Sequence, residues 1–281
     1  MRFKAGFVNI VGNPNVGKST LVNTLMGEKL SIVTPKVQTT RHRILGILTE
    51  NNYQIVFSDT PGIVEANYEM QNRMLVYSFS ALEDADILLY VTDIKDINRI
   101  NNAFITKINK LSIPVFLIIN KIDLHLQEEI TKAKLFWQQQ VPKAILFEVS
   151  ALKAIATNNL FDKILELLPV HPPYFPDDIV SDKTERFFVS EIIREKIFIH
   201  YYEEIPYSIE VQVEEFKEKQ DIIVIKVKIF VLRESQKNII IGRKGEMIKK
   251  IGMEARKDIE KFLQKKVFLE LFVKVKKNWR N

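Results

Sequence analysis

The chain has 281 residues, of which 46% are hydrophobic and 27% are charged, and it contains no cysteine. These fractions are typical of soluble globular proteins and exclude disordered, collagen-like and coiled-coil proteins. The absence of cysteine excludes a disulfide framework, thiolate catalysis and cysteine-ligated zinc. No apolar run approaches the roughly 18 residues of a membrane span, and no signal-peptide core follows the first residues. We therefore expect a cytoplasmic protein with two domains.

The net charge of +6 is distributed unevenly along the chain. Residues 1–180 hold 18 Lys and Arg against 18 Asp and Glu, whereas residues 222–281 hold 17 against 6. A basic block after a neutral body favours an anionic partner, with nucleic acid first and a membrane surface second. A lysine-rich solvated face without a partner is the alternative.

A proline-rich stretch divides the chain. Four of the ten prolines fall within residues 168–178, where neither a helix nor a central strand can persist. We predict a linker at 171–183 between a first domain at 1–170 and a second domain at 184–281. The glycines form two clusters, one on each side of a long gap between Gly62 and Gly242. Because glycine allows sharp turns and close approach of a ligand, each cluster predicts one site.

The first domain alternates short apolar runs with helix-like stretches. Strands are predicted at 7–11, 54–57, 87–91, 115–119 and 145–149, and helices at 19–26, 71–82 and 159–168. This alternation predicts an α/β domain with a mainly parallel sheet that is covered on both faces. Ligands are expected at the carboxyl ends of the strands.

A phosphate-binding loop is predicted at residues 12–19, which read GNPNVGKS. The loop follows a strand and opens a helix, as such a loop requires, although an ordinary strand-to-helix turn is the alternative. Lys18 is expected to reach the β- and γ-phosphates, and Ser19 to offer a hydroxyl to Mg²⁺. The expected nucleotide contacts are Gly12, Asn13, Pro14, Asn15, Val16, Gly17, Lys18, Ser19 and Thr20.

A second motif, DTPG at residues 59–62, follows the strand predicted at 54–57. A carboxylate at this strand end can order a water bound to the metal, and the Gly62 N–H can face a γ-phosphate. A surface aspartate before a Pro-Gly turn is the alternative for the motif taken alone. The expected nucleotide contacts here are Asp59, Thr60, Pro61 and Gly62.

Two further motifs at strand ends predict recognition of a base. Residues 120–123 read NKID, and residues 150–151 are Ser-Ala. A carboxylate at Asp123 accepts hydrogen bonds from both N1–H and the 2-amino group of guanine, and adenine offers no such pair of donors. The Ala151 N–H is expected to reach guanine O6. The expected base-side contacts are Asn120, Lys121, Asp123, Ser150 and Ala151.

Taken together and in order, these motifs resemble those of the translation-factor-related GTPases, which implies binding of GTP and GDP. Residues 36–43 then resemble switch I, with Thr40 as a ligand of Mg²⁺ beside Ser19, and Asp59 as a ligand through water. Thr39 is the alternate. The expected catalytic residues are Lys18, Thr40, Gly62 and Asn15.

Two positions bear on the rate of hydrolysis. Ile63 follows the DTPG motif where many GTPases have a glutamine that orients water, so unaided hydrolysis is expected to be slow. In related GTPases, an asparagine at the position of Asn15 helps hold K⁺ beside the phosphates. Asn15 equally fits a plain turn, and both interpretations stay open.

The second domain shows the element order αββααβ. A helix is predicted at 186–202, strands at 208–216 and 222–232, a helix entering Gly242, a helix at 245–263 and a strand at 267–275. The loop 242–245 (GRKG) joins two helices, as in a type II KH domain, whose GxxG loop clamps a nucleic-acid backbone. The expected RNA-binding residues are Gly242, Arg243, Lys244, Gly245, Lys249 and Lys250. For Lys249, Lys250, Arg256 and Lys257, a solvated surface is an equal alternative.

A P-loop GTPase domain followed by an α+β type II KH domain closely resembles the Era family of bacterial GTPases. Residues 38–43, 190–196 and 251–258 also resemble signatures of that family. The resemblance implies a monomeric GTPase that binds 16S rRNA near its 3′ end and assists assembly of the small ribosomal subunit. It also implies some peripheral association with the inner membrane. An RNA-binding module with a relic nucleotide domain and a membrane-signalling GTPase are the alternatives.

Overall fold

The computed structural model describes residues 2–63 and 69–276. The chain divides into two compact units, Met1–Asp182 and Lys183–Asn281. The last residues of the predicted KH domain, 277–281, lie outside the described residues. Each unit is described on its own below.

The first unit is built on a mixed sheet with the strand order β2-β3-β1-β4-β5-β6. All neighbouring strands are parallel except β2 and β3, so the predicted mainly parallel sheet is confirmed. The strands are β1 (Lys4–Val11), β2 (Ile44–Glu50), β3 (Tyr53–Asp59), β4 (Ile87–Asp93), β5 (Val115–Asn120) and β6 (Ile145–Glu148).

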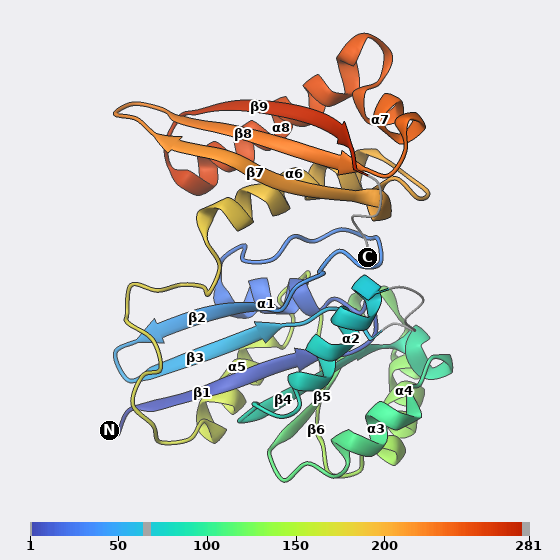
Figure 1. Ribbon diagram of the computed structural model, residues 1–281. Coiled ribbons are helices and arrows are strands. Elements are labelled where there is room, and N and C mark those ends of the chain that lie inside the picture. The colour runs from blue at the N-terminus through green and yellow to red at the C-terminus, as the bar shows by residue number, and fades with distance from the viewer. Residues whose placement is uncertain (1, 64–68, 277–281) are drawn as a thin grey trace. The chain divides into compact units, whose positions relative to one another are not determined.

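Helices cover both faces of this sheet (Figure 1). They are α1 (Lys18–Met26), α2 (Glu69–Ser80), α3 (Asn102–Ile108), α4 (Gln127–Gln140) and α5 (Thr157–Leu167). Strand β4 shows the two faces clearly, because Leu89 packs with α1 and α5 while Leu88 packs with Phe104 of α3 and Trp137 of α4. Burial on both sides explains why these strands read as continuous apolar runs.

Strand β2 is absent from the sequence-based prediction, as are helices α3 and α4. β2 pairs antiparallel with β3 through a short turn, which is the one departure from parallel pairing. Gly46 weakens its strand signal, and a Cβ added there would lie 2.5 Å from Leu30 Cδ2, so the glycine lets this side chain pack closely against the strand. The glycine that interrupts the strand pattern of β2 therefore reflects packing against Leu30, which the local sequence does not reveal.

The proline-rich segment packs along the first unit as an ordered strap. The Gln54 side chain in β3 accepts hydrogen bonds from the N–H groups of Tyr174 at 2.7 Å and Phe175 at 3.0 Å. Its amide donates to Phe175 O at 2.8 Å and Thr49 Oγ1 at 2.9 Å. Further along, the Ile47 N–H of β2 donates to Val180 O at 2.9 Å. Much of the segment predicted as a linker is therefore hydrogen-bonded to strands β2 and β3 of the sheet.

The second unit has the element order αββααβ, as predicted. It comprises α6 (Glu185–His200), β7 (Ile209–Glu218), β8 (Ile223–Val231), α7 (Glu234–Ile241), α8 (Glu246–Leu263) and β9 (Val267–Val275). The sheet order is β7-β8-β9, with β7 antiparallel and β9 parallel to β8. Helices α6 and α8 pack on one face of this sheet around Ile225, Val227 and Ile251 (Figure 1).

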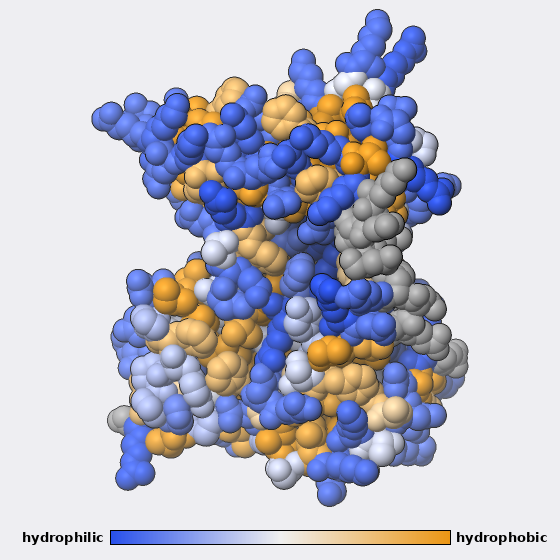
Figure 2. Space-filling view, viewed as in Figure 1, coloured by the Kyte–Doolittle hydropathy of each residue, from blue (hydrophilic) through white to orange (hydrophobic). Residues whose placement is uncertain are grey.

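The opposite face of this sheet is open to solvent. Figure 2 shows it as mostly hydrophilic, with scattered apolar side chains. The lysines of β8 on this face are matched by glutamates on neighbouring strands, as between Lys226 and Glu215 at 3.2 Å. Phe268 and Phe272 of β9 are the exposed aromatic residues of the strand. Among the described residues, no helix has both the length and the apolar character needed to cross a membrane.

We expect Gln54→Met to destabilise the first unit. Gln54 is fully buried, and its loss leaves the backbone polar groups of Tyr174 and Phe175 without their partners. Unsatisfied buried groups should lower the free energy of unfolding by about 2 to 4 kcal/mol in urea titrations. Hydrogen exchange should accelerate at residues 174 and 175. Gln138→Met on the exposed face of α4 is the matched control. Equal stability of the two variants would contradict this account of the strap.

Candidate functional site

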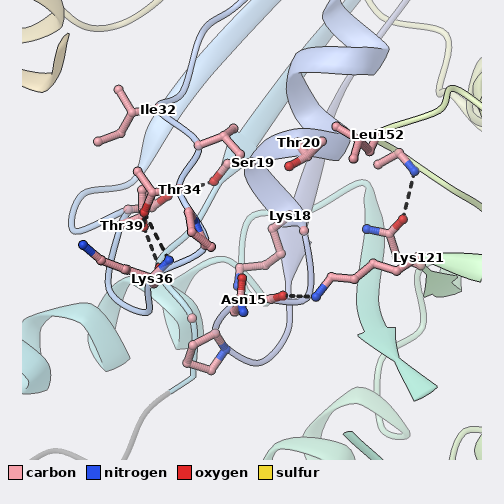
Figure 3. A pocket seen from close by; sticks show the side chains of 18 of the residues that line it. Asn15, Lys18, Ser19, Thr20, Ile32, Thr34, Lys36, Thr39, Lys121 and Leu152 are labelled. Atoms are coloured by element: carbon pink, nitrogen blue, oxygen red, sulfur yellow. Dashed lines mark hydrogen bonds between the residues drawn. The ribbon is translucent and has the colours of Figure 1, made fainter. Parts of the chain in front are cut away.

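The carboxyl ends of the parallel strands meet at one pocket of about 370 Å³ (Figure 3). Residues from the predicted motifs line it: Pro14, Asn15, Gly17, Lys18, Ser19, Thr20, Thr40, Thr60, Gly62, Asn120, Lys121, Asp123, Ser150 and Ala151. Five predicted contacts are not among its lining residues: Gly12, Asn13, Val16, Asp59 and Pro61. All five are buried.

The loop after β1 has the backbone of a phosphate cradle. Gly12, Asn15 and Gly17 have positive φ angles of 147°, 64° and 94°. A side chain cannot replace hydrogen at Gly12, because an added Cβ would lie 2.0 Å from Val91 O. The positive φ of Asn15 agrees with its interpretation as a turn residue, since asparagine tolerates this conformation better than most residues.

Lys18 is folded back onto the loop that it follows. Its Nζ donates to Gly12 O at 3.0 Å and to Asn13 O at 2.8 Å. Burial lowers the pKa of Lys18 to about 8, an effect that the nearby carboxylates of Asp59 and Asp96 oppose. The two carbonyl groups hold the ammonium in position beside the pocket. An anion entering the pocket would stabilise the charged form further.

Three predicted metal-site residues come together below the loop. Ser19 Oγ donates to Asp59 Oδ2 at 2.7 Å and lies 2.8 Å from Thr40 Oγ1. Thr39 is placed elsewhere, because its hydroxyl donates to Lys36 O at 2.7 Å and lies 2.7 Å from Thr34 Oγ1. The geometry therefore groups Thr40, rather than the alternate Thr39, with Ser19 and Asp59.

The donor set of this cluster suits Mg²⁺. Asp59 is fully buried, and its Oδ1 has no hydrogen-bond partner among the described residues. Burial raises the pKa of Asp59, while the hydrogen bond from Ser19 and the charge of Lys18 oppose the rise. One carboxylate and two hydroxyls match the sparse protein ligation of Mg²⁺. The described residues contain no cluster of three or more His, Cys, Asp and Glu suited to a metal.

Asn120 joins the two ends of the pocket. Its Nδ2 donates to Val16 O at 2.9 Å, and its Oδ1 accepts from the Ala151 N–H at 2.9 Å. Gly17 must be a glycine for this contact, because an added Cβ would lie 2.4 Å from Asn120 Nδ2. The structure thus gives the Ala151 N–H a partner other than the guanine O6 expected from the sequence.

Lys121 links the base side of the pocket to the phosphate loop. Its Nζ donates to Asn15 O, as Figure 3 shows, and forms an ion pair with Asp93 Oδ2 at 2.9 Å. Asp123 is exposed and makes no hydrogen bond or ion pair with any described residue. Its carboxylate is therefore available to a ligand at this end of the pocket.

A buried acidic pair lies behind the phosphate loop, and the sequence motifs do not indicate it. Asp93 ends β4 and holds Lys121, while Asp96 follows in the turn Ile94–Asn98. Burial raises the pKa of Asp96 to about 6, and the charge of Asp93 adds to the rise. Asn13 donates to Arg99 O at 2.9 Å, which ties the loop to the end of this turn. The pair places negative charge near Lys18 and Lys121.

Two apolar residues at the base end were also missed. Leu124 and Leu152 line the pocket although they are 69% and 75% exposed. A flat aromatic base can cover such side chains and remove them from water. The sequence did offer a signal for them, because a leucine directly follows each of the two base-side motifs. Ile32 lines the opposite part of the pocket, as Figure 3 shows.

The DTPG segment is held tightly against the phosphate loop. An added Cβ on Gly62 would lie 2.6 Å from Pro14 Cα, and the Ile63 N–H donates to Gly12 O at 3.2 Å. Ile63 itself is 6% exposed and packs in the core with Val11 and Tyr90. Its side chain therefore points away from a bound phosphate and cannot orient a water there.

The loop 242–245 of the second unit lies between α7 and α8. Gly242, Lys244 and Gly245 have positive φ angles of 73°, 52° and 78°. Gly242 needs a glycine because an added Cβ would lie 2.7 Å from Met247 Cβ. Arg243 and Lys244 are exposed at the tip, and Lys249 and Lys250 are exposed on the first turns of α8. The predicted RNA-binding residues therefore lie close together along the chain and reach solvent.

Two segments of the chain match known protein families. Residues 7–121 match the family described as 50S ribosome-binding GTPase, and residues 204–280 match the KH domain family. A curated relative from Geotalea daltonii, GTPase Era, is 46% identical over 281 residues, covering 99% of this chain and 94% of the relative. GTPase Era from Thermosipho melanesiensis is also 46% identical, with 99% and 94% covered.

Two solved structures resemble the whole chain. A crystal structure of Era in complex with MgGDPNP and nucleotides 1506–1542 of 16S ribosomal RNA has a TM-score of 0.93 and 40% identity. The match covers 99% of this chain and 95% of that one. A variant of Era from Aquifex aeolicus bound to GDP and AlF4⁻ has the same TM-score and identity, covering 99% and 96%.

The lowered pKa of Lys18 predicts a pH-dependent affinity for GDP. Below pH 8 the ammonium is charged in the free protein, and above pH 8 the proton must be taken up when phosphate binds. In EDTA, we expect the Kd for GDP to rise about fourfold between pH 7 and pH 8.5. Calorimetry in two buffers should detect the proton uptake. Lys18→Met should bind more weakly at every pH and lose the dependence, and a flat profile in the unmodified protein would contradict the assignment.

Proposed function

The chain belongs to the Era family of GTPases, and from this membership we propose that it binds 16S rRNA near the 3′ end and assists assembly of the small ribosomal subunit. Relatives named Era have been captured with MgGDPNP and with GDP and AlF4⁻, in keeping with hydrolysis of GTP. The alternative of a relic nucleotide domain is therefore set aside. The proposal combines a nucleotide switch in the first unit with RNA binding in the second.

One observation carries the nucleotide half of the proposal. Ser19, Thr40 and Asp59 converge within hydrogen-bond distance, and a buried carboxylate oxygen is left without a partner. Such a cluster satisfies its polar groups only when a cation or water joins it. Magnesium held there would neutralise charge that develops on the β- and γ-phosphates. Thr40 lies in the segment predicted as switch I, so its contact at this cluster would make that segment sensitive to the nucleotide.

The remaining steps rest on residues of the chain. The amides of the phosphate loop and Lys18 hold the phosphates in place, and Gly62 lines the same pocket. No side chain at position 63 orients water, because Ile63 is in the core. We propose that hydrolysis is slow until the pocket gains a further positive charge. K⁺ held beside Asn15 is one source of such a charge, supported by the exposed position of Asn15 at the pocket.

For the second unit, we propose that loop 242–245 clamps single-stranded RNA. Its support is the pair of exposed cations at the tip together with the positive φ angles that bring backbone close to a ligand. Lys249 and Lys250 extend the positive charge onto α8. A monomeric state, a cytoplasmic location and peripheral association with the inner membrane stay predictions, which gel filtration and cell fractionation would test.

Guanine selectivity provides the first test. Asp123→Asn replaces a double acceptor with a mixed donor and acceptor, so the affinity for GTP should fall by roughly a hundredfold. Xanthosine triphosphate should become the preferred ligand in a direct binding assay. Asp162→Asn, at an exposed position of α5, is the control for removal of one charge. Equal binding of ATP and GTP by the unmodified protein would refute the base-recognition assignment.

The role of Asn15 is tested by exchange of the monovalent cation. We expect K⁺ to stimulate turnover of GTP severalfold over Na⁺ at equal ionic strength, because a weakly hydrated cation can join the phosphates. Asn15→Ala should remove this difference while GDP binding persists. Asn159→Ala, on the exposed surface of α5, should keep the full response. A K⁺ response that survives in Asn15→Ala would show that the ion site is elsewhere or that Asn15 is a turn residue.

The RNA loop is tested with the double variant Arg243→Asp and Lys244→Asp. Negative charge would then meet the phosphate backbone, so binding of RNA from the 3′ region of 16S rRNA should fall at least tenfold. Because both side chains are exposed, the melting temperature should stay within a few degrees. GTP turnover without RNA should persist. Undiminished RNA affinity would overturn the assignment of the loop.

A further inference from the structure

Helix α8 carries a row of cations beyond the loop. We define the α8 ridge as the exposed residues Lys249, Lys250, Arg256, Lys257 and Lys261. They recur at helical spacing on the side opposite the buried residues Ile251, Ala255 and Ile259. From Lys249 to Lys261 the ridge spans roughly 18 Å at the rise of an α-helix. It starts directly after loop 242–245, since Gly245 is the N-cap of α8.

The acidic residues of the second half of α8 each contact a neighbouring element of the second unit. Glu254 accepts a short hydrogen bond from His200 of α6, with 2.6 Å between Oε2 and Nε2. Asp258 forms an ion pair with Lys196 of α6. Glu260 accepts a hydrogen bond from the Val267 N–H at 3.0 Å. These contacts draw Glu254 and Asp258 toward α6, although Lys250 also contributes to lowering the pKa of Glu254 and Glu246 is exposed at the start of the helix.

Within the described residues, the ridge has almost no ion pairs. Arg256 approaches Glu260 at 4.0 Å, at the limit for such a contact. The lysines on the open face of the sheet are different, because Lys228 pairs with Glu214 and Lys226 with Glu215. The two lysines of β8 are therefore paired with carboxylates, whereas Lys249, Lys257 and Lys261 of the ridge form no ion pair with any described residue. Unpaired cations of this kind are the electrostatic footprint of a polyanion.

We propose that the α8 ridge binds the phosphate backbone of RNA that continues from the strand clamped at loop 242–245. The inference rests on the proposed function of that loop and extends it by a second contact. A GxxG loop clamps only about four nucleotides, so a longer RNA must lie on other surface beyond them. The ridge adjoins the loop and bears the complementary charge. It contributes affinity and orientation without reading bases.

An anionic lipid surface is the competing source of phosphate. Helices that lie on membranes bury an apolar face, usually with large residues, beside their cations. On the ridge side of α8, the exposed apolar residue is Met253, flanked by charge, and the large apolar residues of α8 pack largely toward the domain core. The charge pattern without an insertable face therefore favours RNA over lipid.

The test is a triple variant, Arg256→Gln, Lys257→Gln and Lys261→Gln. Glutamine keeps the helix propensity of lysine and arginine, so α8 should fold normally. Binding is measured for RNAs of about four and about thirty nucleotides from the same 3′ region, the shorter matching the length that the loop clamps. The full-length protein loaded with GDP is used throughout. The control, Lys110→Gln, Lys132→Gln and Lys143→Gln, removes the same charge from exposed positions of the first unit.

We expect the ridge variant to lose on the order of tenfold in affinity for the longer RNA, with a salt slope smaller by about 2. Affinity for the shorter RNA and the melting temperature should match those of the control variant. Equal loss in both triple variants, or no loss for the longer RNA, would overturn the inference. So would loss of binding to phosphatidylglycerol vesicles alone, which would assign the ridge to lipid.

The double variant of the loop separates the two proposals. Should Arg243→Asp with Lys244→Asp abolish RNA binding while the ridge variant binds normally, only the ridge inference fails. If the loop variant binds both RNAs normally, the proposed function of the loop fails, whatever the ridge variant does.

Discussion

The site depends on one side chain that joins three separate parts of the chain. Asn120 ends β5, donates to Val16 of the phosphate loop and accepts from Ala151 after β6. Because it is buried, both hydrogen bonds form away from water and hold two loops in fixed register. Gly17 is required by the same contact. Asn120 thereby fixes the distance between the phosphate loop and the loop after β6 at the base end of the pocket. A bound nucleotide has to span this distance.

The sequence predicted most of what surrounds this contact, because the motifs lie at strand ends and parallel strands end together. The motifs predicted Ser19 and Asp59 at one metal site, and the resemblance to GTPases added Thr40, with Thr39 as the alternate. The sequence could not predict that the Ala151 N–H would be taken by Asn120 or that Asp93 would pair with Lys121. Those contacts depend on long-range packing, which short motifs do not encode. Strand β2 was missed for the same reason, since Gly46 reflects a neighbour from another segment.

Charge in the second unit shows the same difference between composition and structure. The excess of Lys and Arg in residues 222–281 is visible in the sequence, but its distribution over the surface is not. Lysines of β8 face glutamates of β7, whereas Glu254 and Asp258 of α8 contact His200 and Lys196 of α6. The open face of the sheet and the α8 ridge therefore differ in electrostatic potential, although both carry lysines. The pairing of acids, more than the number of bases, determines where a polyanion would be attracted.

Ile63 affects both the packing of the site and the rate of GTP hydrolysis that we expect from it. Its buried side chain and its N–H bond to Gly12 O press the DTPG segment against the phosphate loop. A polar side chain that reached the pocket from this position would have to leave the core, at a cost of lost apolar burial and packing. The same packing that shapes the pocket therefore keeps a water-orienting group out of it. We therefore expect a switch of this construction to hydrolyse GTP slowly until another group completes the site, in keeping with the proposed role in an assembly step.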